Sequence, residues 1–191
     1  MHMTNRELWT ALHGMIFGAG FLLAFSGGFF GLWGLRSDWL TGEGAKRRLC
    51  VLAVGTWGMT ILAWLAVILG TYVIYPWYRA KPPAIPGVSL ADYPKYLLLS
   101  DTQTADWHEF GMEWKEHVAW LAPISITMAF AVFVKYGRGL QTQPQLRNAV
   151  LCFVLVSFLA AGIAGFFGAM LNKNAPVEGG PIVHFVKGES R

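Results

Sequence analysis

Two of the five histidines have the spacing and surroundings needed to hold a metal cofactor together. His13 and His117 each stand just before a long run without charged residues, so we expect both imidazoles at one depth in a membrane. Ionisable side chains at such a depth usually face the interior of a helix bundle. In an up-down four-helix bundle, the helices that carry them are parallel and lie on a diagonal. This arrangement predicts a haem with two axial histidines, of the b type, because the chain has no Cys-x-x-Cys-His attachment sequence.

Small residues follow His13 at helical spacing. At about 100° per residue, Gly20, Ala24 and Gly27 lie within about 40° of His13 on a helical wheel. They would form a groove that accepts a flat macrocycle. The same pattern is typical of a helix-packing seam, and a histidine near the membrane surface can simply bond to water. Both interpretations are open, a cofactor site and a structural seam.

The stretch 106–117 carries most of the remaining polar chemistry. Glu113 shares a helical face with His117 and is predicted to accept a proton from a quinol bound near the haem. The alternative is an acidic surface that contacts a basic partner or water. His108 lies nine residues before His117 and about half a turn out of phase, so the two cannot serve one site together. The sequence does not decide which of them is the ligand.

Long apolar segments must position these residues. Of 191 residues, 54% are hydrophobic and only 14% are charged, whereas soluble domains carry roughly 25% charged residues. Charge-free runs occupy 14–35, 49–75, 118–134 and 149–171, and a membrane-spanning helix needs about 20 such residues. We therefore predict an all-α integral membrane protein with four transmembrane helices, at about 8–35, 47–75, 106–136 and 146–171. They form one domain, 1–175, with a Pro-rich outer loop at 76–105 and a C-terminal tail at 176–191.

The distribution of charge predicts the orientation of this bundle. The connections 36–48 and 135–147 hold seven of the fifteen Lys and Arg residues, and nine of the eleven acidic residues lie elsewhere. By the positive-inside rule, both termini and the Pro-rich loop face outward. In a bacterium this places the chain in the inner membrane with its termini in the periplasm. The net charge of +4 comes from short loops, which argues against a nucleic-acid partner.

The arrangement is similar to small four-helix cytochrome b subunits in architecture, without a shared diagnostic motif. This resemblance implies that the chain is an electron-transfer subunit of a larger respiratory or photosynthetic complex. One haem near the outer face cannot carry electrons across about 30 Å of hydrocarbon. It would therefore connect a quinone pool to an exported electron carrier. The alternative function is an accessory subunit without a cofactor, which docks partner proteins in the membrane.

Overall fold

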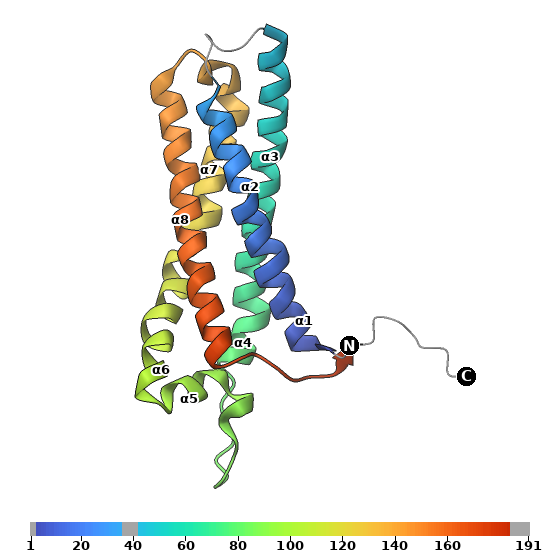
Figure 1. Ribbon diagram of the computed structural model, residues 1–191, viewed down its shortest axis with the longest axis vertical. Helices are drawn as coiled ribbons and strands as arrows, with labels where there is room; N and C mark the ends of the chain where they lie inside the picture. Colours follow the sequence, from blue (N-terminus) through green and yellow to red (C-terminus); the bar gives the residue numbers. More distant parts are fainter. Residues whose placement is uncertain (1–2, 36–41, 184–191) are drawn as a thin grey trace, which may run out of the picture.

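The computed structural model describes residues 3–35 and 42–183, and these residues form an elongated helical protein (Figure 1). Four helical spans are long and apolar enough to cross a membrane, namely Asn5–Trp33, Gly42–Tyr78, Thr102–Leu140 and Pro144–Asn174. The prediction of a helical chain with four helices long and apolar enough to span a membrane is confirmed. Each span extends beyond its apolar run, because polar residues continue the helix outside the hydrophobic segment. The second span, for example, begins at Gly42, ahead of the basic run 46–48.

Three of the four spans consist of several consecutive helical segments. The first span comprises α1 (Asn5–Ala11), η1 (Leu12–Gly18) and α2 (Ala19–Trp33). The second comprises α3 (Gly42–Leu69), η2 (Gly70–Ile74) and α4 (Tyr75–Tyr78). The third comprises α6 (Thr102–Asp106), η4 (Trp107–Met112), η5 (Trp114–Val118), α7 (Leu121–Tyr136) and η6 (Gly137–Leu140). The fourth span is the single helix α8 (Pro144–Asn174).

The main helices pack in a ring in which α2 contacts α3 and α8, and α7 contacts the same two helices. Their shared core is aliphatic and aromatic, and its almost completely buried members include Phe21, Leu32, Met59, Ile126, Val150 and Val154. The outward side chains are also apolar, for example Leu23, Val51 and Val134, which are exposed in the isolated chain. An apolar exterior around an apolar core is the pattern of helices that contact lipid.

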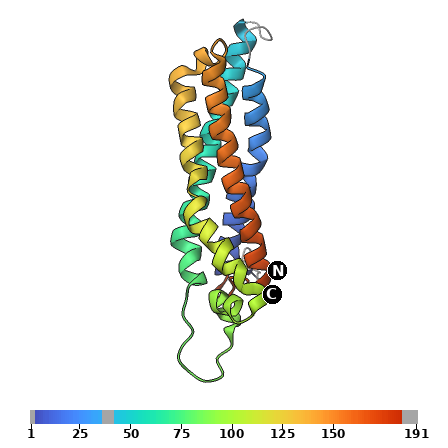
Figure 2. The ribbon, with the colours of Figure 1, turned by 90° about the vertical axis from the view of Figure 1, so that its left-hand side faces the viewer.

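The two ends of the bundle differ. Strand β1 (Met3–Thr4) pairs antiparallel with β2 (Ile182–Val183), which joins the two ends of the described chain at one end of the bundle. We call this the terminal end. The connection between the second and third spans lies there too, with η3 (Leu90–Asp92) and α5 (Pro94–Leu99) after a segment that extends beyond the helices (Figures 1 and 2).

Arginines close the opposite end. The buried guanidinium of Arg147 donates to the carbonyl oxygens of Leu35 at 3.1 Å and Leu140 at 3.3 Å. Arg48 donates to the carbonyl oxygen of Gly34 at 3.2 Å. Carbonyl groups at helix C-termini lack partners within the helix and carry partial negative charge, so cations stabilise them. Arg147 thereby fixes the ends of α2 and η6 to the start of α8.

Polar side chains inside the bundle are used to connect helices. The indole N–H of Trp64 donates to Thr127 Oγ1 at 3.0 Å, and this hydroxyl donates to the carbonyl of Pro123 at 2.6 Å. The buried Ser157 hydroxyl donates to the carbonyl of Ala122 at 2.7 Å. These contacts tie α3 and α8 to the first turns of α7, where Pro123 lacks the N–H that a regular helix would use.

Candidate functional site

The terminal half of the bundle contains four π-helical segments, η1, η2, η4 and η5. They lie near the start of the first and third spans and near the end of the second span, and so at a similar level. π-helical turns are rare and occur often at functional sites. Three of the four carry the residues that could do chemistry, with His13 in η1, His108 in η4 and both Lys115 and His117 in η5.

His13 lies against the second span and is half-buried. Its Nδ1 atom is 2.8 Å from the carbonyl oxygen of Ala66, so Nδ1 carries the proton in the neutral ring. The ring packs on Gly70, where an added Cβ atom would lie 2.8 Å from Cε1 of His13. A backbone carbonyl on one ring nitrogen leaves the other as a free lone pair, which is the usual state of a metal-ligating histidine. The geometry therefore allows His13 to bind a metal through Nε2.

His117 points away from the bundle. Its side chain is 70% exposed, and its Nδ1 atom lies 3.1 Å from the carbonyl oxygen of Glu113 and 3.3 Å from a carboxylate oxygen of the same residue. The apolar neighbours on this face, Leu121, Ile124 and Met128, are exposed as well. The residues expected to share a face with His117 do share it, but that face is the outer surface of the bundle. In this arrangement the structure does not bring His117 to the interior site of His13.

His108 belongs to a separate contact at the terminal end. Its Nδ1 atom is 2.7 Å from the hydroxyl oxygen of Tyr78, which is almost completely buried. The centroids of the Tyr78 and His108 rings are 5.8 Å apart, and this contact joins α4 to η4. His108 is thus directed to the end of the second span and not to the carbonyl of Ala66 that holds His13.

The small residues after His13 pack in several directions. A Cβ atom on Gly20 would meet Leu62 of α3 at 3.6 Å, whereas a Cβ on Gly27 would meet no atom within 4 Å. Ala24 packs against the core cluster. The tightest place on this helix is Gly31, where a Cβ would lie 2.6 Å from Cδ2 of Leu52. Gly20 and Gly31 are therefore helix-packing positions against α3, while Gly27 faces outward.

Two residues that the sequence analysis did not select as site residues, Trp114 and Lys115, lie against α8. The ammonium group of the half-buried Lys115 sits over Gly168, since a Cβ atom on that glycine would lie 2.7 Å from Nζ. The Lys115 charge is close enough to act on the His13 imidazole. The buried indole N–H of Trp114 has no hydrogen-bond acceptor among residues 3–35 and 42–183. The only sequence signal for these residues was their place in the polar stretch that precedes the third apolar run.

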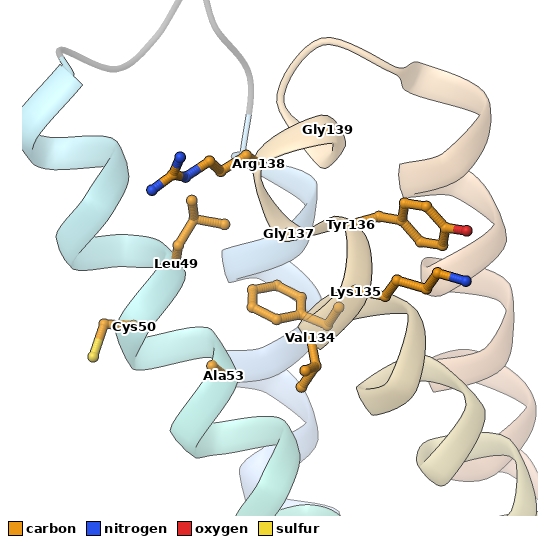
Figure 3. Close-up of a pocket in the computed structure, with 10 residues that line it drawn as sticks. Leu49, Cys50, Ala53, Val134, Lys135, Tyr136, Gly137, Arg138 and Gly139 are labelled. Atoms are coloured by element: carbon orange, nitrogen blue, oxygen red, sulfur yellow. The ribbon is translucent and has the colours of Figure 1, made fainter.

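Other places in the described ranges offer less chemistry. No group of three or more His, Cys, Asp or Glu side chains lies close enough to hold a metal ion in this part of the chain. A groove of about 660 Å³ runs between α3 and α7, lined by Leu49, Cys50 and Ala53 on one side and by residues 133–139 on the other (Figure 3). It lies at the opposite end of the bundle from the histidines. The titratable groups that lie close to one another are therefore at the terminal end, around His13 and at the pair His117 and Glu113.

Comparison of the whole chain with protein-family models, with curated proteins and with solved structures finds no match.

Proposed function

We propose that this chain is an electron-transfer subunit of a larger membrane redox complex, with His13 as an axial ligand of one b-type haem. The single observation that supports this proposal is the 2.8 Å contact between His13 Nδ1 and the Ala66 carbonyl. It fixes the ring orientation and leaves Nε2 for iron. When bound, the haem supplies a one-electron couple, and the chain supplies the ligand, its orientation and a low-polarity surrounding.

The second axial position is a separate assignment. Of the two predicted ligands, only His13 is turned to the interior of the bundle, because His117 is exposed and bonded to Glu113. Whether His117 or His108 is the second ligand is therefore decided by substituting each histidine and measuring haem binding. Neither residue is needed for the first part of the proposal.

The proposed orientation places the terminal end at the outer face of a bacterial inner membrane, with the four spans in up-down order. The densities of Lys and Arg in the connections support this orientation. A haem at that end would exchange electrons with a quinone pool on the membrane side and with an exported carrier on the aqueous side. Other subunits of the complex would cover part of the apolar exterior.

The outward pair His117 and Glu113 supports a second candidate function, a quinol site that faces lipid. The two side chains are 3.3 Å apart, both are mostly exposed, and exposed apolar residues continue the same face. A quinol that diffuses in the bilayer would reach this pair directly, and either group can accept a proton. In this function His117 acts as a base and not as an iron ligand.

The absorption spectrum of the purified chain, with a pyridine haemochrome assay, tests the proposal. We expect a Soret band in the wild type that is lost in His13→Gln. Glutamine can still donate to the Ala66 carbonyl, and it does not provide an imidazole nitrogen for iron. Retention of the band in His117→Ala would remove His117 as a ligand and leave the quinol function for it. A wild-type chain without haem that purifies only in a stoichiometric complex would overturn the proposal in favour of an accessory subunit.

A further inference from the structure

We propose that Lys115 is the anchor of a binding site for an oxyanion, the carboxylate or phosphate of an amphiphilic ligand, at the terminal end of the bundle. The site consists of the Lys115 ammonium, the surface of α8 at Gly168 and the neighbouring His13. Two sources can bring this chemistry to a membrane protein, namely a haem propionate and the phosphate of an anionic lipid. The first source rests on the proposed haem, and the second does not.

The Lys115 ammonium has no counter-ion within residues 3–35 and 42–183. The only ion pair among the described residues joins His117 to Glu113, and the Lys115 ammonium forms no hydrogen bond within these residues. The neighbouring carboxylates on its own helix are directed elsewhere, since Glu113 bonds His117 and Glu116 acts on Tyr75 and Tyr78. From α8 the ammonium meets a glycine, and from η1 the His13 imidazole lies within range of its charge. An unpaired charge that is partly withdrawn from water is costly unless an anion binds it.

The Lys115 ammonium lies away from the end of the bundle. Lysines near helix ends commonly extend toward water and need no partner. The ammonium of Lys115 instead lies on Gly168, six residues before the end of α8 at Asn174, or about 9 Å along the helix axis. The absence of a side chain at Gly168 gives the ammonium its room there. The cation is thus held along the bundle rather than at its end.

A second N–H donor without an acceptor in the described part of the chain, the indole of Trp114, lies against the same stretch of α8. The Trp114 ring packs 6.3 Å from the Phe167 ring, next to Gly168, and its buried N–H has no acceptor in the described part of the chain. Two adjacent residues, Trp114 and Lys115, therefore bring N–H donors to two adjacent residues of α8, and neither donor has an acceptor among residues 3–35 and 42–183. Buried donors are almost always satisfied in native proteins. A ligand rich in oxygen acceptors would satisfy both.

The test uses the full chain in detergent and in nanodiscs, with pairs of probes that differ only in charge. One arm titrates haemin and haemin dimethyl ester by absorption, because esterification removes the two carboxylates. The other arm measures bound phosphatidylglycerol and phosphatidylcholine by native mass spectrometry. If haem is the source, we expect the wild type to prefer haemin about tenfold or more, as a charge-assisted bond would provide. If lipid is the source, we expect retained phosphatidylglycerol and no retained phosphatidylcholine.

Variants connect the preference to Lys115. Lys115→Met should abolish the preference, and Lys115→Arg should keep it. Gly168→Ala retains the charge but must displace the ammonium, so it should weaken binding of the anionic probe in a chain with an unchanged lysine. Lys173→Met is the matched control, because Lys173 is an exposed lysine in the last turn of α8. It should behave as the wild type.

The outcomes separate this inference from the proposed function. If the wild type binds no haem, the haem proposal fails, and the lipid arm still decides the role of Lys115. The inference is wrong if the wild type shows no charge preference in either arm. It is equally wrong if Lys115→Met and Gly168→Ala retain the preference of the wild type.

Discussion

The Nδ1 atom of His13 and the carbonyl oxygen of Ala66 lie 2.8 Å apart and join the first span to the second. Gly70, four residues beyond Ala66, makes this contact sterically possible, because the imidazole occupies the space that a side chain at position 70 would need. The pair sets the direction in which the second ring nitrogen of His13 is presented. The first prediction therefore concerns Gly70.

Gly70→Ala should displace the His13 ring and weaken its bond to Ala66, because the new Cβ atom would lie 2.8 Å from Cε1. Overpacking of this kind costs about 1–3 kcal/mol. We expect a lower free energy of unfolding in detergent and, if haem is bound, a weakened Soret band. Gly55→Ala is the matched control in the same span, since a Cβ there meets no atom within 4 Å. Equal stability of the two variants would contradict the described packing of His13.

Gly31→Ala should destabilise the chain by forcing a Cβ atom to within 2.6 Å of Cδ2 of the buried Leu52. The neighbouring Gly27→Ala is the control, because position 27 is open. Leu52→Val shortens the opposing side chain, so the double variant should recover stability relative to the sum of the single changes. A coupling of about 0.5–3 kcal/mol is typical of residues in contact. Strict additivity, measured by unfolding in mixed micelles, would show that α2 and α3 do not meet at this point.

Ser157→Ala should cost about 0.5–2 kcal/mol, the range for hydrogen bonds between helices in membranes. The buried Ser157 hydroxyl crosses from α8 to the carbonyl of Ala122 in α7. Ser26→Ala is the control, because Ser26 is exposed and bonds only to Leu23 in its own helix. The measurement is the free energy of unfolding of each variant. A cost for Ser26→Ala equal to that for Ser157→Ala would rule out an interhelical origin.

Arg147→Met should destabilise the end of the bundle opposite to the termini by about 1–3 kcal/mol. The change removes the buried donor that serves the Leu35 and Leu140 carbonyls, and it leaves helix C-terminal groups unsatisfied. Arg138→Met removes the same charge from an exposed side chain of the same connection and should have little effect. Hydrogen exchange of the last turns of α2 and η6 locates the effect. Uniform loss of protection across the bundle would argue against local capping.

Hydropathy was sufficient to predict four spans in this chain. In hydrocarbon each backbone polar group needs a partner inside its own segment, so an apolar run of about 20 residues has few forms other than a helix. The equal depth of His13 and His117 in the membrane is a prediction from the same count. The shared face of Glu113, His117, Ile124 and Met128 also followed from helical spacing, but the sequence could not tell whether that face was inside or outside.

The sequence by itself determined that this chain forms four helices long and apolar enough to span a membrane, and that its histidines His13, His108 and His117 lie toward one end of them. Only the tertiary structure decided which side chains meet there. Helical spacing fixes which residues share a face, but contacts with the neighbouring helices decide whether that face is buried or exposed. His117 faces outward with Glu113, whereas Lys115 lies against α8 at Gly168. Which side chains come into contact depends on how all four helices pack, and the sequence of one helix does not determine it.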